Sequence, residues 1–484
     1  MLSAKNIKDI YGLSPLQEGL LFHALTNPGS TAYVGQVSYR LEGNLRVPLL
    51  EQSFNVLFSR HDMLRTVFSH NKAERPLQVV LRERKVDFTF RDLQTAGDPR
   101  ARLERVEQYK AEDKRRGFDV TRDTLMRLAV FQLEAQVFEV VWSWHHIIMD
   151  GWCLGILQAE FVHVYDCLLQ GRSPDLPPAP PYRSYIDWLG RQHAGEAQEF
   201  WARYLRGYEG VASLPLTYSA LHADGYQLGE YALRLDKHRT AGLNALAARR
   251  KVTLNTVLQV LWGLALGRYS GRQDVVFGTV VSGRPAELEG VESTVGLFIN
   301  TIPVRIVSGP GKRFSELLGE VKQDLAGSEP YHHVQLADLQ RTARGREPLF
   351  NHVLVFENYP LPGQEPAGAR PDEPAAESFN QLTISNLEVF DHNHYPLNVV
   401  VVPGGELEVR FSFNELAYHP GFIAQLAEGF AHLADQVLHD EETPVEALEL
   451  LPAAARDQLL ARAGGPPVYQ PGSTLVERFE QCVA

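Results

Sequence analysis

The chain alternates between short apolar runs typical of strands and longer segments with apolar residues at helical spacing. The short runs are rich in β-branched and aromatic residues, and they predict strands at residues 125–133, 137–144, 274–281, 397–402 and 407–413. The longer segments predict helices at residues 47–58, 154–169, 254–269 and 314–325. Residues 134–136 indicate a hairpin between the first two strands, and residues 403–406 indicate a turn between the last two. This mixture predicts an α/β protein.

The pattern has two halves with a proline-rich link between them. At 484 residues the chain exceeds the roughly 250–300 at which one core stops growing. Residues 173–181 contain five prolines and cannot continue a helix. We therefore expect one unit at residues 1–175, a second at 176–452, and a linker with the start of another domain at 453–484. Residues 363–377, rich in Pro, Ala, Gly and Glu, predict a surface loop.

Composition narrows the class of protein. The net charge of −12 argues against broad nucleic-acid binding, and no apolar run approaches the roughly 20 residues that a membrane span needs. The three cysteines, Cys153, Cys167 and Cys482, are scattered and form no disulfide framework. Residues 1–6 lack the apolar core of a signal peptide and suggest a cut point inside a longer protein. We expect a cytoplasmic location.

The most informative stretch, residues 144–152, joins a predicted strand to a predicted helix. It holds His145, His146, Asp150 and Gly151 at the end of the strand, where active sites of α/β folds gather. Because side chains alternate across a strand, the two histidines should face opposite ways and should not share a metal ion. A bare histidine pair is more often packing than chemistry. Gly151 suits a turn with an unusual φ angle or a close approach of a ligand.

This stretch resembles the His-His-x-x-x-Asp-Gly motif of condensation domains of nonribosomal peptide synthetases, which are chloramphenicol-acetyltransferase-like acyltransferases. Further stretches resemble the family's other motifs in the same order. They are residues 13–23 (LSPLQEGLLFH), 59–68 (SRHDMLRTVF, with Asp for the usual Glu), 182–188 (YRSYIDW), 295–301 (VGLFINT) and 348–356 (PLFNHVLVF). The matches run in the family's order from residue 13 to residue 356, a span that includes most of the chain, so chance agreement is not credible.

The resemblance implies a fold, an activity and partners. The fold is two chloramphenicol-acetyltransferase-like αβα sandwich subdomains that form a V around a central tunnel. The activity is amide-bond formation: the α-amine of an acceptor aminoacyl group attacks the thioester of a donor aminoacyl or peptidyl group. Upstream (donor) and downstream (acceptor) carrier domains deliver both on phosphopantetheine arms, and no cofactor is attached to this chain. Residues 474–481 resemble the first helix of an adjoining adenylation domain.

The resemblance also implies roles for single residues. His146 is the catalytic residue, as positioner or proton acceptor, and His145, Asp150 and Gly151 support it. Arg284 matches the arginine that pairs with the motif's Asp, so Asp150 and Arg284 form a structural ion pair.

Several residues outside the motif are weaker candidates for a functional role. Arg65 is a rival partner for Asp150, and Trp152 is a candidate tunnel contact. His23, His61 and the pair His332–His333 are expected to be structural.

The sequence leaves open the subtype of condensation domain and two alternative functions. The form of residues 13–23 and the Met149 in the His motif match members that join a D-configured donor to an L-configured acceptor. An epimerisation domain of the same superfamily keeps the His motif, and some members are inactive recruiting platforms. A cyclising variant replaces the histidines with an Asp-rich motif, which His145 and His146 exclude.

Overall fold

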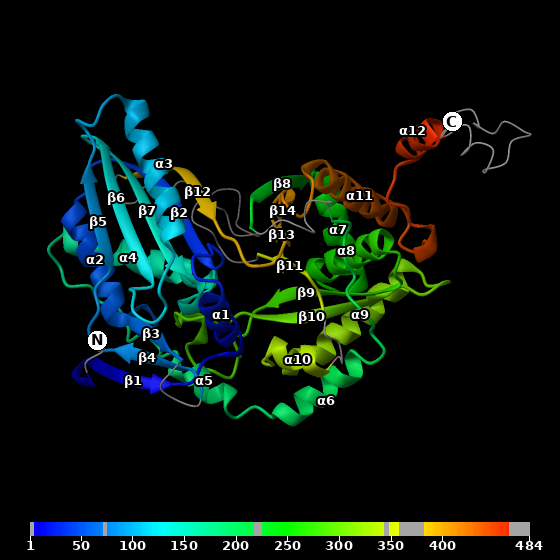
Figure 1. The fold of residues 1–484 in the computed structure, drawn as a ribbon, viewed down its shortest axis with the longest axis horizontal. Helices are drawn as coiled ribbons and strands as arrows, with labels where there is room; N and C mark the ends of the chain where they lie inside the picture. The colour runs from blue at the N-terminus through cyan, green and yellow to red at the C-terminus, as the bar shows by residue number, and fades with distance from the viewer. Residues whose placement is uncertain (1–3, 71–74, 217–224, 343–347, 358–381, 464–484) are drawn as a thin grey trace, which may run out of the picture.

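The structure is a computed structural model that describes residues 4–70, 75–216, 225–342, 348–357 and 382–463. Two lobes lie side by side, one built mostly from the first part of the chain and the other from the second (Figure 1). Each lobe is a β-sheet with helices on both faces, so the predicted α/β fold of two αβα subdomains is confirmed. In the described residues, no helix is both long and apolar enough to cross a membrane.

The first lobe contains a five-stranded sheet in the order β12-β2-β7-β6-β5, and all neighbours but β5 and β6 are antiparallel. Its strands are β2 (Val34–Glu42), β5 (Asp87–Asp92), β6 (Met126–Glu134), β7 (Val137–His145) and β12 (Thr383–Phe390). Its helices are α1 (Pro15–Thr26), α2 (Val47–Arg60), α3 (Pro99–Arg116) and α4 (Trp152–Leu169). A small antiparallel sheet adds β1 (Ile7–Tyr11), β3 (Thr66–Ser69) and β4 (Leu77–Leu81).

Alternation along β7 places its side chains in two separate cores. Val140 and Trp142 pack with Phe54 of α2 in the larger core, while Val141 packs with Val106 of α3 in a smaller one. This is the period of two that a strand imposes when both its faces are covered. The strand that carries the His motif is therefore fixed from both sides.

The second lobe contains a six-stranded mixed sheet in the order β10-β9-β11-β13-β14-β8. Its strands are β8 (Leu228–Leu235), β9 (Asp274–Val281), β10 (Asn300–Val307), β11 (His352–Phe356), β13 (Leu397–Val402) and β14 (Leu407–Asn414). Helices α7 (Lys237–Arg250), α8 (Leu254–Ser270), α9 (Phe314–Ser328) and α11 (Pro420–His439) pack on one face. Helices α6 (Ala194–Tyr204) and α10 (Leu336–Thr342) contribute to a core on the other. Helix α5 (Arg183–Leu189) follows the proline-rich link, and α12 (Ala453–Ala463) ends the described chain.

Helix α8 is the centre of the second lobe, because every residue from 256 to 267 is buried. The indole Nε1 of Trp262 on this helix donates a hydrogen bond of 3.1 Å to Nε2 of His352. Burial lowers the pKa of His352 to about 3, so the ring is neutral and can accept. A polar pair thus sits in the apolar core without an unmatched group.

Strand β12 does not follow the division of the chain at residue 175. It lies in the predicted second unit by sequence, yet it pairs along β2 of the first lobe, from Thr383 opposite Glu42 to Phe390 opposite Gln36. The first lobe's core also includes Tyr182 and Phe298 from beyond the link. The predicted boundaries remain predictions, and segments of the second half contribute to the sheet and core of the first lobe.

The predicted elements are confirmed where they fall in the described residues. Strands β9 and β13 match their predicted ranges, and the ends of the other predicted strands and helices differ from the observed ends by at most three residues. Residues 173–181 have no regular structure, as expected. The predicted loop at 363–377 and the adenylation-like residues 474–481 lie outside the described residues.

Two mid-helix glycines predict opposite effects of added volume. A Cβ at Gly263 in α8 would lie 2.3 Å from Cγ1 of Ile306 on β10, whereas one at Gly319 in α9 would meet nothing within 4 Å. We expect Gly263→Ala to destabilise the protein by about 1–3 kcal/mol through overpacking. Gly319→Ala should stabilise it by roughly 0.5–1 kcal/mol, because alanine restricts the unfolded chain. Thermal melting of both variants tests this, and equal shifts would contradict the close approach of α8 to β10.

Candidate active site

The His motif occupies the turn between β7 and α4. Strand β7 ends at His145, whose register partner is Val34 on β2, and a short 3-10 helix follows at His146–Ile148 before α4 begins at Trp152. Because β7 lies inside the sheet, between β2 and β6, its end is held on both edges. The motif therefore projects from a rigid position, as a site for chemistry requires.

His145 is a structural residue in this geometry. Its ring is buried, and its Nδ1 accepts a hydrogen bond of 3.1 Å from the backbone N–H of Ile147, which caps the short helix. Burial lowers the pKa of His145 to about 3, with smaller contributions from His146 and His23. The ring stays neutral, and its lone pair is already used.

His146 has different surroundings. Its side chain is 13% exposed and lies edge-on to the Trp144 ring at 6.0 Å between centroids. Its Nε2 lies 3.0 Å from Oδ1 of Asp391, in the segment after β12. This distance is that of an ion pair, but the direction is not that of a hydrogen bond, and among the described residues Nε2 has no hydrogen-bond partner.

The charge next to His146 sets its protonation. Burial alone would lower the pKa of His146, but the Asp391 carboxylate opposes this effect, with further help from Asp150 and the Met149 backbone. The net result is a raised pKa for His146 and a lowered pKa for Asp391. The carboxylate thus stabilises the protonated form of the ring relative to the neutral form, which makes His146 a stronger base than an isolated imidazole.

Asp150 joins the two halves of the chain. One carboxylate oxygen lies 3.2 Å from the guanidinium of Arg284, and the other accepts a hydrogen bond of 3.0 Å from the backbone N–H of Phe298. The two charged side chains are 1% and 7% exposed. Arg284 also donates to the carbonyl oxygens of Val291 and Thr294 and lies 4.1 Å from the centre of the Phe298 ring. The ion pair expected from the resemblance is present in the structure.

Cys153 completes this buried cluster. Its sulfur lies 3.2 Å from Oδ1 of Asp150 and accepts a hydrogen bond of 3.3 Å from the backbone N–H of Gly296. Burial and the nearby Asp150 charge raise the pKa of the thiol. The sulfur therefore stays protonated and unreactive.

Gly151 differs from its expectation. Its φ of −60° and ψ of −30° are those of an ordinary helical residue, so the turn does not need glycine for an unusual φ angle. The prediction of an unusual φ is wrong because the chain enters α4 directly, with Gly151 as the cap residue. Trp152 follows with 40% of its surface exposed, and its Nε1 donates a hydrogen bond of 2.9 Å to the carbonyl of Glu292.

The other singled-out residues have local partners. Arg65, the rival for Asp150, pairs with Asp62 at 2.6 Å and donates to backbone carbonyls of its own lobe. His61 lies 2.7 Å from Glu160. His332 contacts Ser328 at 3.0 Å, and burial lowers its pKa to about 4. In the described residues, no group of three or more His, Cys, Asp or Glu side chains could hold a metal ion.

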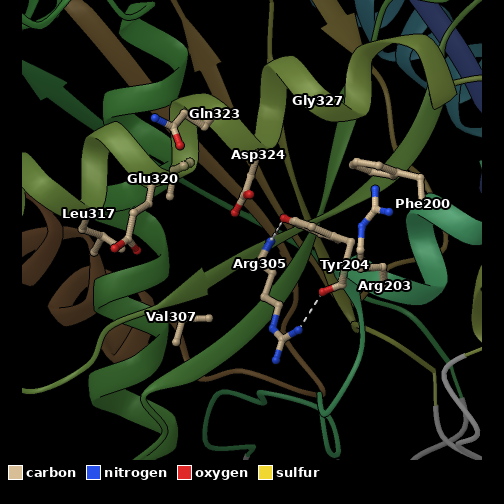
Figure 2. Close-up of a pocket in the computed structure, with 11 residues that line it drawn as sticks. Phe200, Arg203, Tyr204, Arg305, Val307, Leu317, Glu320, Gln323, Asp324 and Gly327 are labelled. Carbon is tan, nitrogen blue, oxygen red and sulfur yellow. Dashed lines mark hydrogen bonds between the residues drawn. The ribbon is translucent and has the colours of Figure 1, made fainter.

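A cavity of about 350 Å³ lies in the second lobe, between α6, β10 and α9, and none of the motif residues lines it (Figure 2). Arg305, which lines the cavity, already has partners. It forms an ion pair with Asp274 at 2.7 Å and donates a hydrogen bond of 2.7 Å to the backbone carbonyl of Tyr204. Tyr204 accepts a further hydrogen bond on its hydroxyl from the Arg305 backbone. These contacts hold α6 against β10, so we assign this cavity a structural role.

Sequence reasoning missed two residues next to His146. Asp391 belongs to a segment that the motifs do not include, and Tyr33 precedes β2 without any sequence signal. The one available hint was the polar and aromatic string at residues 391–395, DHNHY, directly before a predicted strand. Nothing in that string indicates which half of the molecule it contacts.

Comparison with known proteins identifies the family. The family model of the condensation domain matches residues 7–460. Surfactin synthase subunit 3 of Bacillus subtilis (strain 168) is 37% identical over 483 residues, which are 99% of this chain and 37% of that protein. Tyrocidine synthase 2 of Brevibacillus parabrevis is also 37% identical, over 99% of this chain and 13% of that protein. The chain thus spans little more than a third of the length of these relatives, or less.

Solved structures show the same fold at low identity. A four-domain nonribosomal peptide synthetase bound to AMP and glycine has a TM-score of 0.79 at 17% identity, over 92% of this chain and 34% of that one. The first condensation domain of the calcium-dependent antibiotic synthetase, in complex with a substrate analogue, has a TM-score of 0.71 at 19% identity, over 92% and 100%. The motif order, the fold and the family model agree, and this chain belongs to the condensation domain family of nonribosomal peptide synthetases.

Proposed function

We propose that this chain forms an amide bond between two carrier-bound groups. The acceptor is an aminoacyl thioester with a free α-amine, and the donor is an aminoacyl or peptidyl thioester. The observation that supports this most is the state of His146: its Nε2 has no hydrogen-bond partner in the described residues, while a charged carboxylate stands beside it. Such an atom is suited to receive a proton from a third group.

The reaction balances without any other reactant. The nitrogen lone pair of the acceptor amine attacks the thioester carbonyl carbon, and a C–N bond forms. The C–S bond breaks, and its electron pair leaves on sulfur. The proton lost by the amine passes to Nε2 of His146 and then to the departing thiolate, which becomes a thiol.

Positioning supplies more of the rate than proton transfer does. A thioester is already activated, so bringing two tethered groups into line can supply about 7–11 kcal/mol of the barrier. A positioned base adds roughly 10²–10⁴-fold. His146 serves both needs, because a hydrogen bond to the amine orients its lone pair before the proton moves.

The partners follow from the same proposal. Phosphopantetheine arms on an upstream and a downstream carrier domain bring donor and acceptor into a tunnel between the lobes, and an adenylation domain adjoins the chain. The greater length of the relatives supports this, since condensation domains occupy only part of such proteins. The two described cysteines are free thiols, which fits a cytoplasmic location.

His146→Ala should lower the rate of dipeptide formation by about 10²–10⁴-fold with saturating loaded carriers. The melting temperature should stay near that of the unmodified chain, because Nε2 of the ring has no hydrogen-bond partner among the described residues. His145→Ala is the matched contrast: it should lower the melting temperature, since it removes the buried acceptor for Ile147. Wild-type turnover in His146→Ala would remove His146 from the chemistry. Racemisation of a carrier-bound aminoacyl group without condensation would instead favour an epimerisation domain.

Asp150→Ala should lower stability as well as activity. It leaves the buried Arg284 without its counter-charge, and removal of one member of such a pair costs about 3–5 kcal/mol. Arg284→Ala should lower the melting temperature in the same way, and the double variant should lose less than the sum of the single ones. Arg100→Ala, which breaks an exposed pair with Glu104, should leave melting nearly unchanged. Additive losses at 150 and 284 would contradict the coupling.

A D-configured donor should condense faster than its L epimer. The support is the motif form, with Met149 in the place that D-donor members of the family give to Met. Met149 itself is fully buried in the first lobe's core, so the preference must come from residues that line the donor side. Matched D and L donors on one upstream carrier, with one L-acceptor, give the ratio directly, where a factor of ten corresponds to about 1.4 kcal/mol. Equal rates, or faster reaction of the L epimer, would contradict the subtype.

A further inference from the structure

Strand register brings Asp391 to the end of the sheet where the His motif begins. Phe390 lies opposite Gln36 on β2, and Gln36 lies opposite Ser143 on β7. One residue further along β12 therefore reaches the level of Trp144, beside the turn that carries His146. The sheet itself, rather than a loose loop, delivers the carboxylate.

The backbone of Tyr33 fixes both partners at once. Its carbonyl accepts a hydrogen bond of 2.9 Å from the N–H of His146, and its N–H donates one of 2.8 Å to the carbonyl of His392. Tyr33 has a φ of 66°, a conformation that few residues other than glycine adopt. Its hydroxyl also forms a short contact with the His394 ring. One residue thus ties the segment that bears His146 to the segment that bears Asp391.

Helix α3 holds the same strand from the other side. Lys110 pairs with Glu388 of β12 at 2.9 Å, and the Lys114 ammonium lies 4.3 Å from the centre of the Phe390 ring. These contacts lie outside the active site. They keep β12 seated on the first lobe up to the residue before Asp391.

The position of the carboxylate matters for its role. Oδ1 of Asp391 lies 3.0 Å from Nε2 of His146 but outside the direction in which Nε2 forms a hydrogen bond. The carboxylate can therefore stabilise a positive charge on the ring while Nε2 keeps its hydrogen-bonding capacity unused among the described residues. Burial alone would raise the pKa of Asp391, but the neighbouring His146 outweighs this effect and lowers it, so the carboxyl group stays charged.

Other titratable groups around His146 act in both directions. His23 on α1, His145 on β7 and His392 after β12 would oppose a second positive charge if protonated, but burial lowers the pKa of each. Asp150 adds a smaller favourable charge, and it is already paired with Arg284. Asp391 is thus the dominant acidic neighbour of His146 in the described residues.

We propose that Asp391 is a positioning residue for the condensation reaction: it acts through His146 by stabilising the imidazolium formed when Nε2 takes the amine proton. This rests on the proposed function. It also means that the working site needs both halves of the chain, because Asp391 comes from the second half and His146 from the first.

A titration of the ring tests the electrostatic part without any assay of activity. The full chain is labelled with ¹³C-histidine, and the His146 signal is identified by its loss in His146→Ala. In Asp391→Asn, which keeps the size and removes the charge, His146 should titrate at lower pH than in the unmodified chain. Asp391→Glu should restore most of the shift. Glu406→Gln, the same chemical change on the exposed β13–β14 turn, is the control and should leave the titration in place.

Kinetics test the link to the reaction. Asp391→Asn should lower kcat by roughly 10- to 100-fold, as removal of carboxylates that orient metal-bound histidines does. The acidic limb of kcat against pH should move to lower pH, because a His146 of lower pKa stays neutral further down the scale. Asp391→Glu should recover much of kcat, and the melting temperature of all variants should stay close to wild type.

The two proposals fail in different ways. An unchanged His146 titration in Asp391→Asn overturns the role of Asp391, whatever the activity shows. A shifted titration with unchanged kcat and an unchanged pH profile also overturns it. A wild-type chain that condenses no loaded pair overturns the proposed function, while the titration still decides whether Asp391 controls the charge of His146.

Discussion

The buried ion pair between Asp150 and Arg284 is the constraint on which the arrangement of this molecule depends. Asp150 follows the central strand β7 of the first lobe, and Arg284 follows β9 of the second, 134 residues further along the chain. Two buried charges are stable only if each is paired and its remaining hydrogen-bonding capacity is used. Phe298 and the carbonyls of Val291 and Thr294 meet that need. The pair therefore fixes one relative position of the lobes four residues from His146.

A second connection of a different kind lies on the other side of His146. Strand β12 extends the first lobe's sheet at its edge, and its anchor Glu388 remains 65% exposed. An exposed ion pair contributes little to stability. This link therefore depends on backbone hydrogen bonds, including those that Tyr33 forms with His146 and His392. His146 therefore lies between two connections of different kinds, a buried ion pair on one side and strand pairing on the other.

Local features of this molecule could be read from the sequence, and contacts between distant segments could not. Strand β9 was predictable because five hydrophobic side chains and its polar borders are all local. The Asp150–Arg284 contact was expected only through resemblance, since nothing near either residue points to the other. Asp391 could not be identified from the sequence, because its position depends on the register between β12 and β2, which no single segment encodes. The unusual φ angle expected at Gly151 was wrong, because glycine also occurs where φ is ordinary.

The contrast between His145 and His146 shows how neighbouring copies of one side chain become two different groups. Strand β7 ends at His145 and His146 begins the short helix that follows, so the two rings have different surroundings. Complete burial without a counter-charge leaves His145 neutral, and its lone pair holds the turn. His146, next to Asp391, has a raised pKa and is the more basic of the two rings. The α-amine attacks only in its neutral form, and it releases a further proton as the amide bond forms. An imidazole that is basic but still partly neutral can accept this proton, whereas a fully charged one cannot. The sheet supplies the geometry, and the carboxylate from the other half supplies the basicity.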